Sequence, residues 1–134
     1  MNLATLQVEG NAGALEFLKK AIVLDIDAEW AKGDKRRNGH VHESSGFNAT
    51  VADARNSPEL ISQVRSFLAQ CTETKIDFAS MGLSAELAIG FTVGDSEQFV
   101  TGVIFSPSEL RVYGERGLAL SITAYPTSDE ANAT

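Results

Sequence analysis

Residues 57–71 read SPELISQVRSFLAQC, and this segment carries the strongest helix pattern in the chain. Its apolar side chains recur at offsets of 0, 1, 4, 7, 8 and 11, which is the spacing of one helical face: Leu60, Ile61, Val64, Phe67, Leu68 and Cys71. Ser57 is the predicted N-cap, and Pro58 takes the first helical position, which proline favours. A helix with so wide an apolar stripe must pack that stripe against a core.

The segments on either side of this helix alternate between apolar and polar residues, which is the pattern of half-buried strands. In chain order the predicted strands are 3–9, 24–30, 40–51 (with an interruption at 44–46), 85–93, 99–105 and 118–125. A turn at residues 94–97 joins the strands 85–93 and 99–105, so we expect these two to form a hairpin.

Two further helices and a short helix or turn complete the prediction. A helix is expected over 14–23, and another over 107–115, where Ser106 and Glu109 have the spacing of a capping box. The segment 74–81 reads as a short helix or turn that ends at Gly82. Hairpins mixed with helices predict an α+β fold in which a mostly antiparallel sheet has its helices packed on one face, in the order β-α-β-(β)-α-(α)-β-β-α-β.

The length of 134 residues and an apolar content of 43% are those of one globular domain, which we place at residues 1–125. The remainder, 126–134, has no apolar periodicity and is expected to be a disordered tail. A chain of this size needs no disulfide to hold its core, and its single cysteine, Cys71, cannot form an internal one. No apolar run reaches the roughly 20 residues of a membrane helix, and no secretory signal is visible. These features predict a cytoplasmic protein.

The net charge of −7 is unevenly distributed along the chain. Residues 32–37 hold four cations and one acid and so carry +3, which leaves −10 for the rest of the chain. An acidic body repels nucleic-acid backbones and anionic membranes, so we expect neither as a partner. It favours a basic protein partner instead.

Asp25, Asp27 and Glu29 alternate with Ile26 and Ala28, so the strand 24–30 is expected to have one wholly acidic face. Trp30 follows as a possible aromatic anchor, a residue type that dominates many interfaces. We add the neighbouring cations to this candidate partner-binding surface: Lys32, Lys35, Arg36 and Arg37. The hypothesis is a non-catalytic protein-binding module, most concretely an immunity protein that neutralises a basic toxin domain. It implies no catalytic residue, metal or cofactor.

Two alternatives remain open at this point. His40 and His42 lie two residues apart, as two ligands of one metal ion do on a strand, and the acidic strand would complete a metal or small-ligand site. Alternatively, an exposed edge strand pairs copies of the chain into a homodimer or larger oligomer, with the basic loop of one copy on the acidic face of another. Cys71 belongs to neither alternative, because it lies on the apolar stripe of its helix and is expected to be buried.

The second half of the chain combines Phe67-Leu68, the predicted strand pair, FSPSEL at 105–110 and RGLALSITAY at 116–125. WAKGDKR at 30–36 is similar to a lysine–glycine–acid loop that follows a first helix. Over residues 3–125 this pattern resembles the small bacterial proteins of the domain-of-unknown-function 4279 family. The resemblance implies a small α+β fold and brings no agreed activity.

Overall fold

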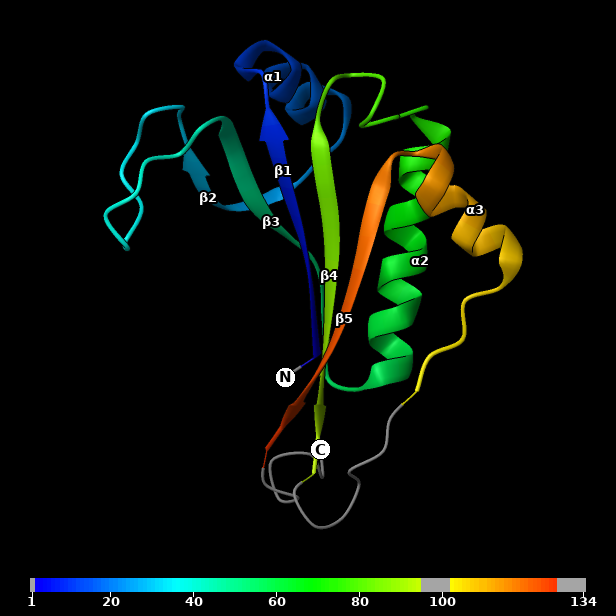
Figure 1. The fold of residues 1–134 in the computed structure, drawn as a ribbon. Helices are drawn as coiled ribbons and strands as arrows, with labels where there is room; N and C mark the ends of the chain where they lie inside the picture. Colours follow the sequence, from blue (N-terminus) through cyan, green and yellow to red (C-terminus); the bar gives the residue numbers. More distant parts are fainter. Residues whose placement is uncertain (1, 95–101, 128–134) are drawn as a thin grey trace.

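The computed structural model describes residues 2–94 and 102–127, which form one α+β domain (Figure 1). Its elements are β1 (Asn2–Gly10), α1 (Ala12–Ala21), β2 (Asp25–Trp30), β3 (Ser45–Ala54), α2 (Ser57–Glu73), β4 (Ser84–Val93), α3 (Pro107–Glu115) and β5 (Leu118–Pro126). The strands build a single mixed sheet in the order β2-β3-β1-β4-β5. The α+β class is as predicted. Within the described residues, no helix is both long and apolar enough to cross a membrane.

The sheet is mostly antiparallel, as expected, and β5 is the exception. The pairs β2–β3, β3–β1 and β1–β4 are antiparallel, whereas β5 runs parallel to β4 from Leu118 beside Ala85 to Pro126 beside Val93. A parallel neighbour requires a crossover connection, and the segment 94–117 with α3 supplies it. One face of the sheet is covered by the helices, and there Leu6 and Leu87 are almost fully buried.

The stripe predicted on α2 forms the centre of the core, and all six of its side chains are buried. The predicted N-cap was one residue too late. Asn56 has extended backbone angles, and its side-chain oxygen accepts a hydrogen bond from the Glu59 N–H at 2.9 Å. Ser57 is therefore the first helical residue. Cys71 is buried as expected, and desolvation raises the pKa of its thiol to about 11.

The helix predicted over 107–115 is α3, and its capping box is complete. The Ser106 hydroxyl accepts from the Glu109 N–H at 3.2 Å, and the Glu109 carboxylate accepts from the Ser106 N–H at 3.0 Å. Glu109 also pairs with Arg65 of α2 at 2.6 Å. The same carboxylate thus caps α3 and joins it to α2.

The predicted hairpin of 85–93 with 99–105 is wrong. Residues 102–105 contain no strand, and β4 is flanked by β1 and β5, so neither of its edges is free. Residues 95–101 lie outside the described part of the chain. Val103 and Phe105 are half-buried against the core, so the alternating pattern reports one-sided burial without strand pairing. Of the expected tail at 126–134, Pro126 belongs to β5 and the Thr127 N–H donates to the Val93 carbonyl at 2.8 Å, while residues 128–134 lie outside the described part of the chain.

Candidate functional site

The segment 31–44 between β2 and β3 forms an arm that projects from the body at the edge of the sheet (Figure 1). The arm has a hairpin ladder of its own. Its backbone hydrogen bonds are 2.6–2.8 Å long: Gly33 N–H to His42 O, His42 N–H to Asp34 O and Arg36 N–H to His40 O. The basic segment is therefore an ordered projection with a defined shape.

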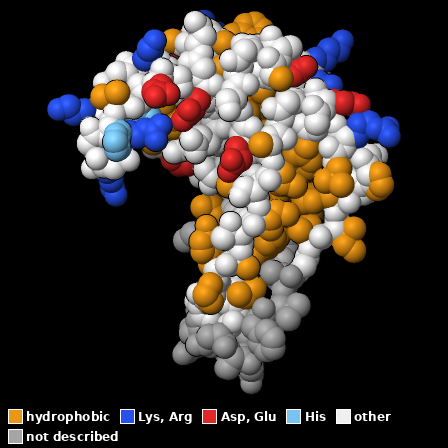
Figure 2. Space-filling model, in the orientation of Figure 1, with side chains coloured by type: hydrophobic (Ala, Val, Ile, Leu, Met, Phe, Trp, Pro, Cys, Tyr) orange, Lys and Arg blue, Asp and Glu red, His pale blue; other side chains and the backbone are white. Residues whose placement is uncertain are grey.

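The tip of the arm is cationic and open to solvent. Its four cations are all exposed, and none makes an ion pair with a described residue: Lys32, Lys35, Arg36 and Arg37. Asp34, the one acid among residues 32–37, accepts a hydrogen bond from the Ala31 N–H at 2.8 Å. Figure 2 shows basic side chains and histidine gathered at the end of the arm. The arm is therefore a positive feature on an acidic protein.

Trp30 lies at the base of the arm, where neighbouring residues determine its position. Its ring stacks on His42 with centroids 4.7 Å apart and an angle of 15° between the planes. It also lies against Gly46, where an added Cβ would be 2.6 Å from the indole Cζ2. The indole Nε1 and the His42 Nδ1 are buried atoms with no hydrogen-bond partner among the described residues. The predicted anchor is thus half-buried, packed between β3 and the arm.

The wholly acidic strand face was a wrong prediction, because β2 contains a bulge. The register with β3 shifts between Ile26 and Ala28, so Asp27 is the extra residue. One extra residue moves all later side chains to the opposite face. Glu29 is consequently opposite Phe47, whose ring is buried beneath the helices. Asp25 is opposite Thr50, and the Thr50 hydroxyl donates to the Asp27 carboxylate at 2.7 Å, so these two acids share the open face.

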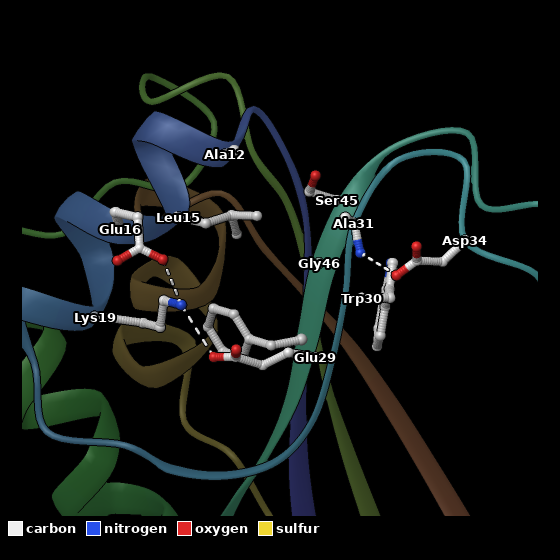
Figure 3. Close-up of a pocket in the computed structure, with 11 residues that line it drawn as sticks. Ala12, Leu15, Glu16, Lys19, Glu29, Trp30, Ala31, Asp34, Ser45 and Gly46 are labelled. Atoms are coloured by element: carbon white, nitrogen blue, oxygen red, sulfur yellow. Dashed lines mark hydrogen bonds and ion pairs between the residues drawn. The ribbon is translucent and has the colours of Figure 1, made fainter.

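Glu29 lines a hollow of about 340 Å³ between α1 and the base of the arm (Figure 3). Leu15 and Phe47 supply an apolar floor to this hollow, which we call the α1 hollow. The Lys19 ammonium lies between two carboxylates, 2.6 Å from Glu16 and 3.0 Å from Glu29. Asp34 also lines the α1 hollow, so three acids and one cation give it a net negative charge. The sequence shows the Glu16–Lys19 spacing, but the contact with Glu29 depends on the bulge.

The ion pair with Lys19 lowers the pKa of Glu16, and the same contact raises the pKa of Lys19. A carboxyl whose pKa is lowered by folding stabilises the protein above its ordinary pKa of 4.5, and this contribution is lost as the pH falls through the folded value.

We therefore expect Lys19→Met to make the thermal stability of the protein less dependent on pH at acidic pH. The wild type loses the Glu16 contribution on acidification, whereas the variant has no such contribution to lose. Thermal unfolding at a series of pH values measures the difference. Lys20→Met is the control, because Lys20 makes no ion pair with a described residue. A variant as acid-sensitive as the wild type would contradict the assignment.

The two histidines of the metal alternative have different surroundings. His42 stacks on Trp30, while His40 is exposed on the arm. Within 2–94 and 102–127, no three His, Cys, Asp or Glu side chains gather in a way that would hold a metal ion. The geometry therefore gives this alternative no support.

Comparison of the chain with protein-family models, with curated proteins and with solved structures found no match. The resemblance over residues 3–125 stays a prediction. Inference about function therefore rests on the arm, the α1 hollow and the charges around them.

Proposed function

We propose that this chain is a non-catalytic protein-binding module, and most concretely an immunity protein that neutralises a basic toxin domain. The observation that supports the proposal is the ordered cationic arm projecting from an otherwise acidic body. Two zones of opposite charge side by side recognise a partner with the complementary pair of zones. Such an arrangement speeds association and permits one orientation of docking.

The acidic zone consists of Asp25, Asp27 and the α1 hollow, and it receives the basic surface of the partner. Asp25 and Asp27 are exposed on the open face. The α1 hollow suits one long cationic side chain of the partner, whose aliphatic stem would cover Leu15 and Phe47 while its charged end lies near Glu16 and Glu29. The arm then meets an acidic area on the same partner and sets the orientation.

The non-catalytic part of the proposal is supported by the contacts that the polar groups already make. Lys19 is held between two carboxylates, and Asp27 accepts from Thr50. Burial raises the pKa of Cys71 to about 11, so the thiol stays protonated near neutral pH and is a poor nucleophile. The contacts of Lys19 and Asp27 stabilise the site and its charge pattern.

The test is capture of partners from a lysate of the native host by the immobilised full chain, at low and at moderate salt. We expect one basic protein at near-equal stoichiometry, released as salt screens the charges. The double variant Asp25→Asn/Asp27→Asn should capture less of it. The control Asp53→Asn/Glu73→Gln removes two exposed acids elsewhere and should capture as much as the wild type.

The proposed site would be contradicted if both double variants captured equally reduced amounts of the partner. It would also be contradicted if the captured partner were acidic. An immunity protein must also meet a second criterion. The captured protein must arrest growth when expressed alone, and co-expression of this chain must restore growth. A harmless partner would leave a binding module and refute the immunity function.

A further inference from the structure

The two outer strands of the sheet differ in how their free edges are protected. Among the described residues β2 and β5 are the terminal strands. Protein sheets commonly guard such edges with charged residues and bulges. β2 has both, since it contains Asp25, Asp27 and Glu29 and its register is shifted at Asp27.

β5 has neither charged residues nor a bulge. Its nine residues, LALSITAYP, contain no charged side chain. Its register with β4 runs without a shift from Leu118 to Pro126, so the strand presents a regular row of backbone groups on its outer side. Within residues 2–94 and 102–127, Pro126 at its end is the one feature that would limit further pairing.

Exposed apolar side chains accompany this unguarded edge. Ile122 is 48% exposed and Tyr125 is 55% exposed, although both lie on a sheet strand. Ile104, in the segment that leads into α3, is 85% exposed. Figure 2 shows hydrophobic side chains gathered along β5 and between it and that segment. A strand that pairs with β5 would cover part of this surface.

We infer that β5 pairs edge to edge with β5 of a second copy of this chain. An antiparallel pair with its two-fold axis at Ile122 places Ile122 opposite its own counterpart. It also places Leu120 opposite Ala124, and Ser121 opposite Thr123. Apolar side chains thus meet apolar ones and hydroxyls meet hydroxyls, and such cross-strand pairs are stabilising.

The charge distribution favours a second copy as the occupant. Each chain carries −7, so two copies associate most readily where neither brings charge, and β5 is such a strand. The arm and the acids of β2 lie at the other end of the strand order. Pairing through β5 therefore keeps the acidic strands apart and leaves both arms free, so this inference does not depend on the proposed function.

The test is the mass of the full chain in solution, measured by light scattering or sedimentation over a range of concentrations. We expect the mass to rise from 14.3 kDa towards twice that value. Ile122→Lys puts two ammonium groups against each other at the axis and should weaken the dimer at least tenfold. The matched control is Val41→Lys, at an arm residue that is 52% exposed, and it should dimerise like the wild type.

Three results would overturn the inference. They are a wild type that stays monomeric at millimolar concentration, a dimer that survives Ile122→Lys in a folded protein, and a dimer lost in Val41→Lys, which would place the interface at the arm. If Ile122→Lys does not fold, hydrogen–deuterium exchange of the wild type tests the pairing of β5 instead. Uptake over residues 118–126 should fall as the concentration rises, and unchanged uptake would refute the pairing. Partner capture by a folded Ile122→Lys should stay intact, which separates this test from that of the proposed function.

Discussion

Gly46→Ala is expected to destabilise the protein by about 3 kcal/mol, the upper end of the usual cost of overpacking. A Cβ at this position would be 2.6 Å from the Val8 backbone oxygen and 2.6 Å from the Trp30 Cζ2. The carbonyl belongs to the β1–β3 ladder and cannot move without breaking strand pairing. The indole must therefore leave Gly46, and the stack on His42 is lost with it.

Chemical denaturation measures the loss of stability, and Trp30 is the one tryptophan in the chain, so its fluorescence reports the displacement directly. Gly114→Ala is the matched control. It lies in α3 with nothing within 4 Å of an added Cβ. There the same substitution should stabilise the protein by roughly 0.5–1 kcal/mol, because alanine favours the helix. Equal effects at the two glycines would show that Trp30 does not rest on Gly46.

Reversing the charge of the arm should slow association with the partner by more than tenfold at low salt. Arg36→Glu/Arg37→Glu changes residues 32–37 from a net +3 to −1. Charged surfaces steer diffusional encounter, and fast steered association exceeds unsteered rates by about two or more orders of magnitude. Stopped-flow mixing with the captured partner measures the rate. The difference between variant and wild type should shrink as added salt shortens the range of the interaction.

A second double variant distinguishes the effect of the arm on the association rate from the effect of the total charge. Arg55→Glu/Arg111→Glu makes the same change in total charge at two exposed arginines on the body. It should slow association far less than the arm variant. If both double variants slow association equally, the arm has no special role in recognition, and the net charge of the protein alone governs the association rate.

The elements that depend on local sequence were predicted well. The apolar stripe of α2, the alternation of β4 and the capping box of α3 each lie within one segment, and each appears as expected. The misplaced N-cap shows the limit of this reasoning, since Asn56 and Ser57 are both good caps and the choice depends on the backbone angles of Asn56.

Features that depend on contacts with a distant segment of the same chain could not be predicted. The side of the strand on which Glu29 lies is set by its register with β3, and the bulge at Asp27 has no signal in the alternating sequence. The position of β5 beside β4 was missed for the same reason. The cations of the candidate site were visible in the sequence, but the α1 hollow was not, because Lys19 reaches Glu29 across ten residues.

The crossover to β5 also governs the order in which the domain is completed during synthesis. A chain made from its N-terminus forms β4 well before β5, and the outer edge of β4 has no neighbour until translation has passed residues 94–117. Through this interval, the strand that holds Leu87 and Ile89 has one edge unpaired. Unpaired strand edges, like exposed apolar surface, make an incompletely folded chain prone to aggregation, which chaperones prevent. The need for help in folding should thus be greatest just before the last of these strands emerges from the ribosome.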